Sequence, residues 1–441
     1  MIYSKRQKNQ RKGDKILMKN PFEKYYKKSK NEKLTILEEQ NYLTRKEIKQ
    51  ITQQVGLTEE VASHMIENQI TLYNLPFGIA PNFLINDKEY VIPMVTEEPS
   101  VIAAASNAAK LIKQAGGFTT FQPKRYMVGE VALQNCPNPK QAIQAIKKEA
   151  NKLVELANLA YPSIVKRGGG AIELSVKELK NQEDNFIVVY LTVDTCEAMG
   201  ANMLNTMLEA LVVPLEELTG GQRLMAILSN FAVQSLASAK CQIPCELLAK
   251  GAITGEEVRD NIIQATNFAK MDIYRATTHN KGIMNGIDAI VIATGNDWRA
   301  IEAGCHAYAS HTGQYQPMTN WTKAKNGDLV GTITLPLAVG TVGGSIGIHP
   351  GAQLAHSLLD KPSASQLAQI IACVGLGQNL AAVKALVTDG IQKGHMQLQA
   401  KSLAIAVGAT GEEISQLTSA LLKEKGFNQA LATQILKDLR K

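Results

Sequence analysis

The chain has 441 residues, of which 45% are apolar and 20% are charged. This composition is that of a globular protein, and the length is enough for about two or three domains. The sequence predicts no membrane-spanning helix, because it lacks a run of about 18 apolar residues. The net charge of +7 comes from residues 1–33, where twelve Lys and Arg accompany three Asp and Glu, so the body lacks the basic surface of a nucleic-acid-binding domain.

Residues 1–33 are predicted to be a basic, disordered extension. A second interpretation is that translation starts at Met18. No apolar segment follows the basic residues, so the extension is not a secretory signal. The non-enzymatic alternative is a nucleic-acid-binding protein that uses this tail, and deletion of residues 1–33 would then abolish its binding.

The six cysteines are spread along the chain. Three residues separate Cys241 from Cys245, without a second cysteine pair or a nearby histidine, so their spacing does not predict a zinc site. Reduced, mostly buried thiols in a cytoplasmic protein are the interpretation that fits this distribution.

The first part of the body combines helical patterns with a hairpin pattern. Residues 34–75 read as helices. Segments 82–85 and 90–95 have strand character and flank Asn86-Asp87, which predicts a β-hairpin of two short strands.

An alanine-rich helix is predicted after the hairpin. Pro99 suits its first position, and Gly116-Gly117 suit its end. Glu98 therefore lies at a helix start, where a carboxylate is also favoured simply by the helix dipole.

Residues 125–233 are predicted to form a separate unit. Their periodicities give six elements in the order β-α-β-β-α-β: 126–134, 138–160, 171–179, 186–194, 201–218 and 223–232. This is the element order of a ferredoxin-like split βαβ unit.

Residues 234–388 return to a larger, mainly helical body. Residues 288–295 read as a buried strand within it. Lys281 is then predicted in a loop before the strand, and Asp297 in the turn after it, at the start of a helix. Further on, residues 377–390 read as a helix and residues 393–396 as a loop.

Lys281 and Asp297 are candidate site residues because a lysine paired with a carboxylate can stabilise a developing oxyanion. Each also has an ordinary interpretation. Lys281 reads as a solvated loop lysine, Asp297 as a helix N-cap, and His395 as a surface histidine.

Four common nucleotide-binding and catalytic motifs are absent from the sequence. The nearest match to Gly-x-Gly-x-x-Gly spans residues 375–380, ends in Leu380 and lies within a helical pattern, so a Rossmann fold is not predicted. The sequence also has no P-loop, no His-Glu-x-x-His and no nucleophile elbow.

Five segments together resemble 3-hydroxy-3-methylglutaryl-CoA reductase, most closely the bacterial class II form. They occur in the family's order: EEPSV (97–101), EAMGANMLNT (197–206), THNKGIMNG (278–286), IATGNDWRA (292–300) and GIQKGHM (390–396). The resemblance covers about residues 60–441, and the basic extension lies outside it.

The resemblance implies a catalytic set of Glu98, Lys281, Asp297 and His395. Lys281 would stabilise the oxyanion, His395 would protonate the departing CoA thiolate, and Glu98 would supply a proton in the aldehyde reduction. Substrate contacts are implied for four further residues: Ser100, Arg275, Asn285 and Gln378.

The resemblance implies that the dinucleotide is bound by five residues: Glu197, Met199, Gly200, Asn202 and Asn230. Glu197 stands where the family usually has aspartate. Tyr161 stands where the member that uses NAD has an acid, and Lys166 and Arg167 lie close by, which favours NADPH over NADH.

The implied fold is α+β. A large, mainly helical substrate-binding domain would comprise residues 34–124 and 234–388, and residues 125–233 would be an inserted ferredoxin-like NAD(P)-binding domain. Residues 389–441 would form a mobile helical flap. A homodimer with shared active sites is also implied, with a trimer of dimers as the larger alternative.

The implied reaction is the reduction of hydroxymethylglutaryl-CoA to mevalonate and CoA by two NAD(P)H, without a metal. The oxidative direction, for mevalonate breakdown, is an alternative. Another CoA-thioester enzyme of the thiolase type would need a cysteine nucleophile beside histidines, and the sequence shows no such set.

Overall fold

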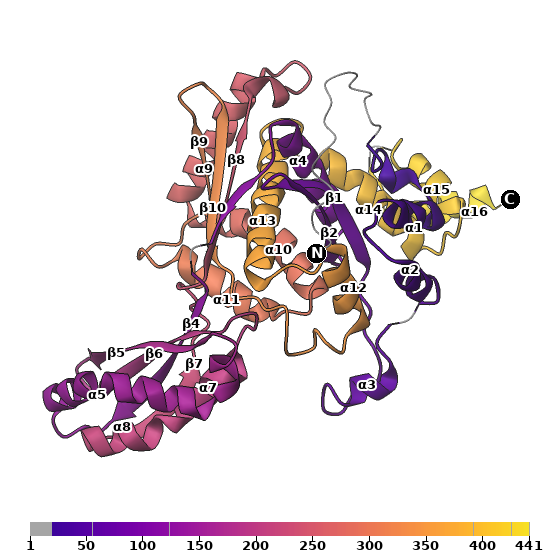
Figure 1. Ribbon diagram of the computed structural model, residues 1–441. Coiled ribbons are helices and arrows are strands. Elements are labelled where there is room, and N and C mark those ends of the chain that lie inside the picture. The colour runs from indigo at the N-terminus through magenta and orange to yellow at the C-terminus, as the bar shows by residue number, and fades with distance from the viewer. Residues whose placement is uncertain (1–19, 55, 123, 391, 425, 441) are drawn as a thin grey trace, which may run out of the picture. The chain divides into compact units, whose positions relative to one another are not determined.

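The computed structural model describes residues 20–54, 56–122, 124–390, 392–424 and 426–440, without the side chains of residues 392–395, 397 and 398 (Figure 1). The chain divides into two compact units, one ending at Gln54 and one beginning at Val55.

The first unit contains η1 (Tyr25–Lys27), α1 (Lys30–Glu39) and α2 (Arg45–Thr52). Ser29 and Glu32 form a capping box that starts α1, and Thr44 with Glu47 repeats the arrangement at α2. The predicted disordered extension reached residue 33, whereas the structure has η1 and the capped start of α1 within that range. Residues 1–19 of that extension lie outside the described residues.

The second unit begins with α3 and a hairpin. Its first elements are α3 (Glu59–Ser63), β1 (Phe77–Ile85), β2 (Lys88–Val95) and α4 (Val101–Gln114). The predicted hairpin is confirmed, and both of its turn residues, Asn86 and Asp87, have positive φ. The expected position of Pro99 is wrong, because α4 begins at Val101 with Ser100 as its N-cap.

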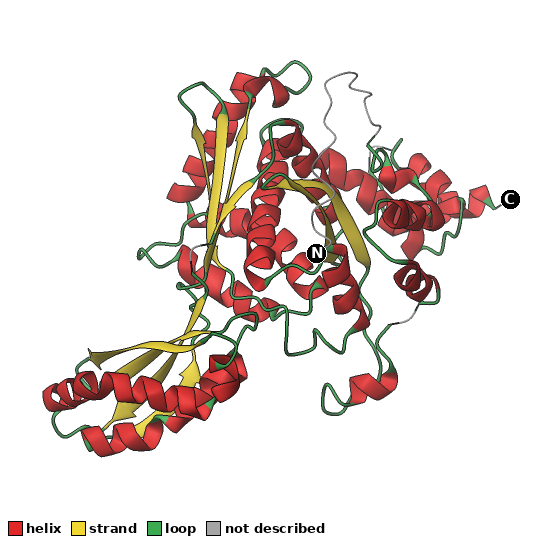
Figure 2. Cartoon of the chain, in the orientation of Figure 1, coloured by secondary structure: helices red, strands yellow, loops and turns green. Residues whose placement is uncertain are grey.

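A four-stranded antiparallel sheet and several helices form the body of this unit (Figure 2). The strand order is β3-β8-β10-β9, with β3 (Thr119–Phe121), β8 (Leu236–Ile243), β10 (Leu329–Pro336) and β9 (Thr319–Lys323). The helical elements are η2 (Cys245–Leu247), α9 (Gly255–Met271), α10 (Ile273–Ala293), α11 (Trp298–Ala309), α12 (Pro350–Leu358) and α13 (Ala364–Leu386).

Helix α13 lies at the centre of the body and packs on α10, α4 and β8. It is long and apolar enough by composition to cross a membrane, but 78% of its apolar window is buried in the protein. Such burial is ordinary for the core helix of a large hydrophobic cluster, so the apolar composition is weak evidence for a membrane span.

Helix α10 replaces the strand that the sequence predicted at residues 288–295. A short apolar run cannot be assigned to a strand or a buried helix by periodicity alone, and here burial on several sides gave the run its strand-like appearance. Asp272 caps the helix, and Gly286 lets it approach α13 closely, since a Cβ there would lie 3.0 Å from Cβ of Gln378. Lys281 is therefore on a helix and not in a loop.

Residues 126–228 form a second sheet with its own helices and its own hydrophobic cluster. The elements are β4 (Tyr126–Gln134), α5 (Pro139–Ala160), α6 (Pro162–Val165), β5 (Gly170–Lys180), β6 (Asn185–Asp194), α7 (Ala201–Ala210), α8 (Val212–Thr219) and β7 (Gln222–Leu228). The antiparallel order β5-β6-β4-β7 places β6 between β4 and β5, as in a split βαβ unit. The helix predicted over residues 201–218 is two helices that meet at Leu211.

Three helices follow the body: α14 (Gln392–Ala406), α15 (Glu413–Leu421) and α16 (Gln429–Leu439). They share a small hydrophobic cluster that includes Ala404, Leu417 and Leu436. The loop predicted over residues 393–396 is wrong, because this segment lies inside α14. The mixed helix and sheet class agrees with the α+β prediction, while the domain boundaries stay predictions.

Candidate active site

Lys281 and Glu98, which are 183 residues apart in the chain, meet in the structure. The ammonium Nζ of Lys281 donates to Oε2 of Glu98 at 2.6 Å, and the amide of Asn285 donates to Oε1 at 3.2 Å. Lys281 and Asn285 are one turn apart on α10, so one carboxylate can accept hydrogen bonds from both side chains. The contact leaves Lys281 61% and Glu98 37% exposed, so water or a substrate can reach the pair.

The turn before α4 places Glu98 beside α10. The backbone N–H of Glu98 donates to the hydroxyl of Thr96 at 3.2 Å, and Ser100 adopts a left-handed conformation with φ 77°. The hydroxyl of Ser100 makes no capping bond to α4. This predicted substrate residue is therefore two positions from Glu98, with a hydroxyl that the helix does not use.

Asp297 is the N-cap of α11. Its Oδ1 accepts the backbone N–H of Ala300 at 3.1 Å and lies 3.7 Å from the guanidinium of Arg299. Within the described part of the chain, no hydrogen bond or ion pair joins Asp297 to Lys281. Of the two predicted carboxylates, the structure therefore brings Glu98 into contact with Lys281 and leaves Asp297 as a helix cap.

His395 lies in α14, and its side chain is outside the described residues.

Two predicted substrate residues, Arg275 and Gln378, have polar groups that are removed from water. Arg275 stands in the first turn of α10, and partial burial lowers the pKa of its guanidinium. Gln378 is buried on α13, and its Oε1 has no hydrogen-bond partner among the described residues. An unpaired buried acceptor is costly, and a ligand that donates to it would remove that cost.

Behind Lys281 a buried network joins α10 to α13 and β9. The imidazole Nε2 of His279 lies 2.7 Å from the hydroxyl of Thr319 and 3.0 Å from the amide of Asn379. Burial lowers the pKa of His279 to about 4, so this histidine is neutral near pH 7. Sequence reasoning missed the network because its members are ordinary core residues until the fold brings them together.

The segment predicted to bind the dinucleotide is a tight turn between β6 and α7. Gly200 has φ 96° and serves as the N-cap of α7 without a side-chain capping bond. The first amides of α7, at Ala201 and Asn202, are therefore not used by a cap and suit an anion such as a phosphate. Met199, on the other side of Gly200, lies against Gly340, where a Cβ would come within 2.7 Å of its backbone nitrogen.

Arg125, which the sequence did not single out, fixes this turn. Its guanidinium donates to the carbonyls of Cys196 and Val339, and to that of Ala198 at 3.1 Å. Burial lowers its pKa, and the nearby carboxylate of Glu197 opposes that shift. The only signal in the sequence was a basic residue directly before a strand, which is too common to be informative.

Glu197 and Asn230 lie at the edges of the cofactor segment. The carboxylate of Glu197 accepts the backbone N–H of Ala364 at 2.6 Å and the hydroxyl of Thr341 at 3.0 Å, so it is engaged with the start of α13. Asn230 is exposed, and its carbonyl lies against Gly304, where a Cβ would come within 2.8 Å.

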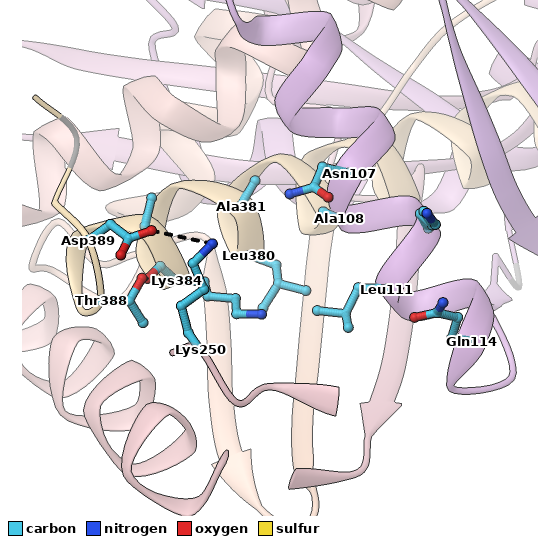
Figure 3. Close-up of a pocket in the computed structure, with 12 residues that line it drawn as sticks. Asn107, Ala108, Leu111, Gln114, Lys250, Leu380, Ala381, Lys384, Thr388 and Asp389 are labelled. Carbon is cyan, nitrogen blue, oxygen red and sulfur yellow. Dashed lines mark hydrogen bonds and ion pairs between the residues drawn. The ribbon is translucent and has the colours of Figure 1, made fainter. Parts of the chain in front are cut away.

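A pocket of about 350 Å³ lies along the same two helices that carry Ser100 and Gln378 (Figure 3). Its walls come from the later turns of α4 and α13 and from the turn at Lys250. Lys110, Lys250 and Lys384 give it positive charge, and Lys250 pairs with Asp389 at 3.3 Å. Partial burial and the neighbouring Lys250 lower the pKa of Lys384. Glu98 and Lys281 are not among its lining residues, so this pocket is not the reacting centre.

No group of three or more His, Cys, Asp or Glu side chains among the described residues has a metal-binding arrangement. The six cysteines are free thiols, four of them buried.

Comparisons with known proteins agree on one family. The family model Hydroxymethylglutaryl-coenzyme A reductase matches residues 29–400. The chain is 43% identical to the 3-hydroxy-3-methylglutaryl-coenzyme A reductase of Archaeoglobus fulgidus over 94% of both chains, and 35% identical to the probable enzyme of Borreliella burgdorferi over 78% of both.

The fold is similar to that of the 3-hydroxy-3-methylglutaryl-coenzyme A reductase from Streptococcus pneumoniae. The TM-score is 0.82 at 52% identity, covering 95% of this chain and all of that one. A class II structure from the same organism, with TM-score 0.81, is bound to NADPH in open conformations. The chain therefore belongs to the hydroxymethylglutaryl-coenzyme A reductase family of oxidoreductases and is similar to its class II members.

Proposed function

We propose that the protein reduces hydroxymethylglutaryl-CoA to mevalonate and free CoA with two NADPH. Family membership supports the substrate and the reaction class. The contact between Lys281 and Glu98 is the observation in this chain that carries the proposal. It joins a cation and a carboxylate from distant segments at a position that a substrate can reach.

Lys281 stabilises the negative charge that develops when the thioester carbonyl becomes tetrahedral. Glu98 and Asn285 fix the position of the ammonium before the reaction, so little reorganisation is needed as the charge appears. In the proposal Asp297 is a second carboxylate near Lys281. The subunit partner or the substrate must help to bring these two side chains into contact.

Glu98 supplies the proton in the second reduction, from aldehyde to alcohol. Its carboxyl group is in direct contact with Lys281, so a proton can pass between the two groups to the substrate oxygen. His395 protonates the CoA thiolate that leaves after the first reduction, since imidazole titrates near neutral pH. The atoms balance: two hydrides and two protons convert the thioester to a primary alcohol and a thiol.

The dinucleotide supplies hydride in both steps, and the turn at residues 195–202 fits its phosphates. The uncapped start of α7 offers backbone N–H groups to an anion. NADPH is the proposed form because a related structure is bound to NADPH and because Lys166 and Arg167 are exposed after α6, where they can meet a 2′-phosphate. NADH is the alternative donor, and the proposed reaction needs no metal.

The positively charged pocket of Figure 3 is the proposed location of the CoA phosphates. Helix α4 leads from Ser100 to Lys110, about 15 Å along its axis, and α13 leads from Gln378 towards Lys384. Both helices therefore connect the proposed reacting centre with the lysines. The pantetheine arm of CoA likewise separates its thioester from its phosphates.

The test is a nicotinamide absorbance assay with purified protein, hydroxymethylglutaryl-CoA, and NADPH or NADH in turn. The proposal predicts substrate-dependent oxidation of NADPH, with two NADPH used for each mevalonate formed. Acetyl-CoA serves as the control thioester, because it lacks the free carboxylate of hydroxymethylglutaryl-CoA. We propose that the guanidinium of Arg275 binds this carboxylate, a task that suits its planar pair of donors. Absence of oxidation with both dinucleotides, or equal rates with both thioesters, contradicts the proposal. The reverse assay, mevalonate and CoA with NADP, measures the oxidative direction.

A further inference from the structure

Residues 339–341, the bridge segment, lie between β10 and α12 and contact the turn at residues 195–202. Thr341 donates its backbone N–H to the carbonyl of Glu197 at 2.8 Å and its hydroxyl to the carboxylate of Glu197 at 3.0 Å. A Cβ on Gly340 would come within 2.7 Å of the backbone of the same turn. The bridge segment is therefore packed directly against the turn that is proposed to bind the dinucleotide.

The side chain of Asn296 holds the bridge segment from another side. Its Nδ2 donates to the carbonyl of Gly340 at 3.1 Å, and the backbone N–H of Gly340 donates to its Oδ1 at 2.7 Å. Nδ2 also lies 3.1 Å from the hydroxyl of Thr294, the C-cap of α10. Both amide donors and the acceptor are engaged, so the orientation of this side chain is fixed.

Asn296 directly precedes Asp297, the N-cap of α11. The turn between α10 and α11 is formed by the backbone, because the N–H groups of Gly295 and Asn296 each donate at 3.0 Å to carbonyls in the last turn of α10. The side chain of Asn296 therefore sets where this turn lies relative to the bridge segment. Within the described part of the chain it makes no hydrogen bond to residues 195–202.

We propose that Asn296 is a positioning residue that couples the turn carrying Asp297 to the dinucleotide turn through the bridge segment. The inference rests on the proposed function, in which both turns serve one reacting centre. A fixed spacing between the turns keeps the carboxylate of Asp297 aligned with the bound dinucleotide, and small displacements of reacting groups are costly. Asn296 itself contacts neither ligand and acts only through its neighbours.

The variant Asn296→Ala tests the coupling, because it removes both hydrogen bonds to Gly340 and leaves the backbone of the turn intact. We expect the Kd for NADPH, measured by nicotinamide fluorescence, to rise about tenfold, as for the loss of one or two neutral hydrogen bonds. We expect kcat to fall about tenfold as well, because Asp297 is no longer held in place. The KM for hydroxymethylglutaryl-CoA should stay within about twofold of the parent.

Asn326→Ala is the matched control. Asn326 is an exposed asparagine in the turn between β9 and β10, and its side chain also makes two hydrogen bonds, at 2.8 and 3.3 Å, to Asp328. Its removal should leave the Kd for NADPH and kcat unchanged. A purely structural role of Asn296 would lower the melting temperature and leave both quantities of the folded protein as in the parent.

Thr341→Val carries the test if Asn296→Ala does not fold. It keeps the shape of the side chain and removes only the hydroxyl that donates to Glu197. The same two changes are expected on a smaller scale, about threefold each. Thr322→Val, an exposed position on β9, is its control and should behave as the parent.

The coupling requires both changes together. An unchanged Kd for NADPH or an unchanged kcat in the folded variant would overturn it. The proposed function fails separately, if the parent binds NADPH but does not reduce hydroxymethylglutaryl-CoA. In that case the comparison of Kd values between the parent and Asn296→Ala still decides whether the bridge segment connects the two turns.

Discussion

Helix α10 and the turn at residues 195–200 serve the same proposed reaction in different ways. Helix α10 presents side chains, and Lys281 and Asn285 are fixed by a carboxylate from another segment. The turn presents backbone, and Arg125 fixes it by donating to main-chain carbonyls. A substitution on the solvent side of α10 should therefore remove chemistry without loss of structure. A substitution of Arg125 should loosen the turn that binds the dinucleotide, while the reacting groups stay in place.

The largest effect is expected for Lys281→Ala, which removes the proposed oxyanion partner. We expect kcat to fall about 10³-fold, as when a positioned donor is lost from an oxyanion site. The melting temperature should change little, because exposed ion pairs contribute about 1 kcal/mol or less. Lys270→Ala, at the exposed end of α9, is the control and should keep normal turnover. Turnover of Lys281→Ala within tenfold of the parent would exclude the assigned role.

A smaller effect on turnover and a larger one on stability are expected for Arg125→Ala. The substitution leaves the carbonyls of Cys196 and Val339 without their donor, which should cost about 2–4 kcal/mol of unfolding free energy, while the carbonyl of Ala198 keeps the hydroxyl of Thr195. The KM for NADPH should rise about tenfold or more, because the start of α7 is no longer held in place. Lys124→Ala, one position earlier and exposed, should alter neither quantity. Dinucleotide titration and chemical denaturation measure the two effects.

The weakest expected effect concerns the positively charged pocket. Lys384→Ala should raise the KM for hydroxymethylglutaryl-CoA about tenfold and leave kcat nearly unchanged, as for loss of binding that is equal in ground and transition states. Lys113→Ala removes a lysine of the same α4 region that pairs with Glu89 and does not line the pocket, so its KM should stay normal. An equal rise in both variants would mean that general surface charge, and not this pocket, attracts the substrate.

The contrast between the two regions also separates what the sequence predicts from what it does not. Local signals predicted the β1–β2 hairpin, the β-α-β-β-α-β order of residues 126–228 and the helix that follows Asp297, its N-cap. Each of these depends on turn residues, on an alternating pattern or on a helix cap. The prediction of a strand at residues 288–295 was wrong because α10 is buried on several sides. Such burial removes the amphipathic period that distinguishes a helix.

For the site, the resemblance named Glu98 and Lys281, and the structure brings these two together. Their pairing could not come from periodicity, because it depends on how α10 packs beside the turn before α4. The role of Arg125 was not predicted at all. A basic residue before a strand is ordinary in sequence, and only burial and its contacts with three carbonyls make Arg125 unusual.

The central claim is that Lys281 and Glu98 act as one unit, and a double-mutant cycle on kcat tests it most directly. Residues that work together lose most of their joint effect when either is removed. We therefore predict that Lys281→Ala combined with Glu98→Ala turns over within about tenfold of Lys281→Ala alone. If the two losses instead multiply to the full product of the single effects, the residues act independently and the paired site is wrong.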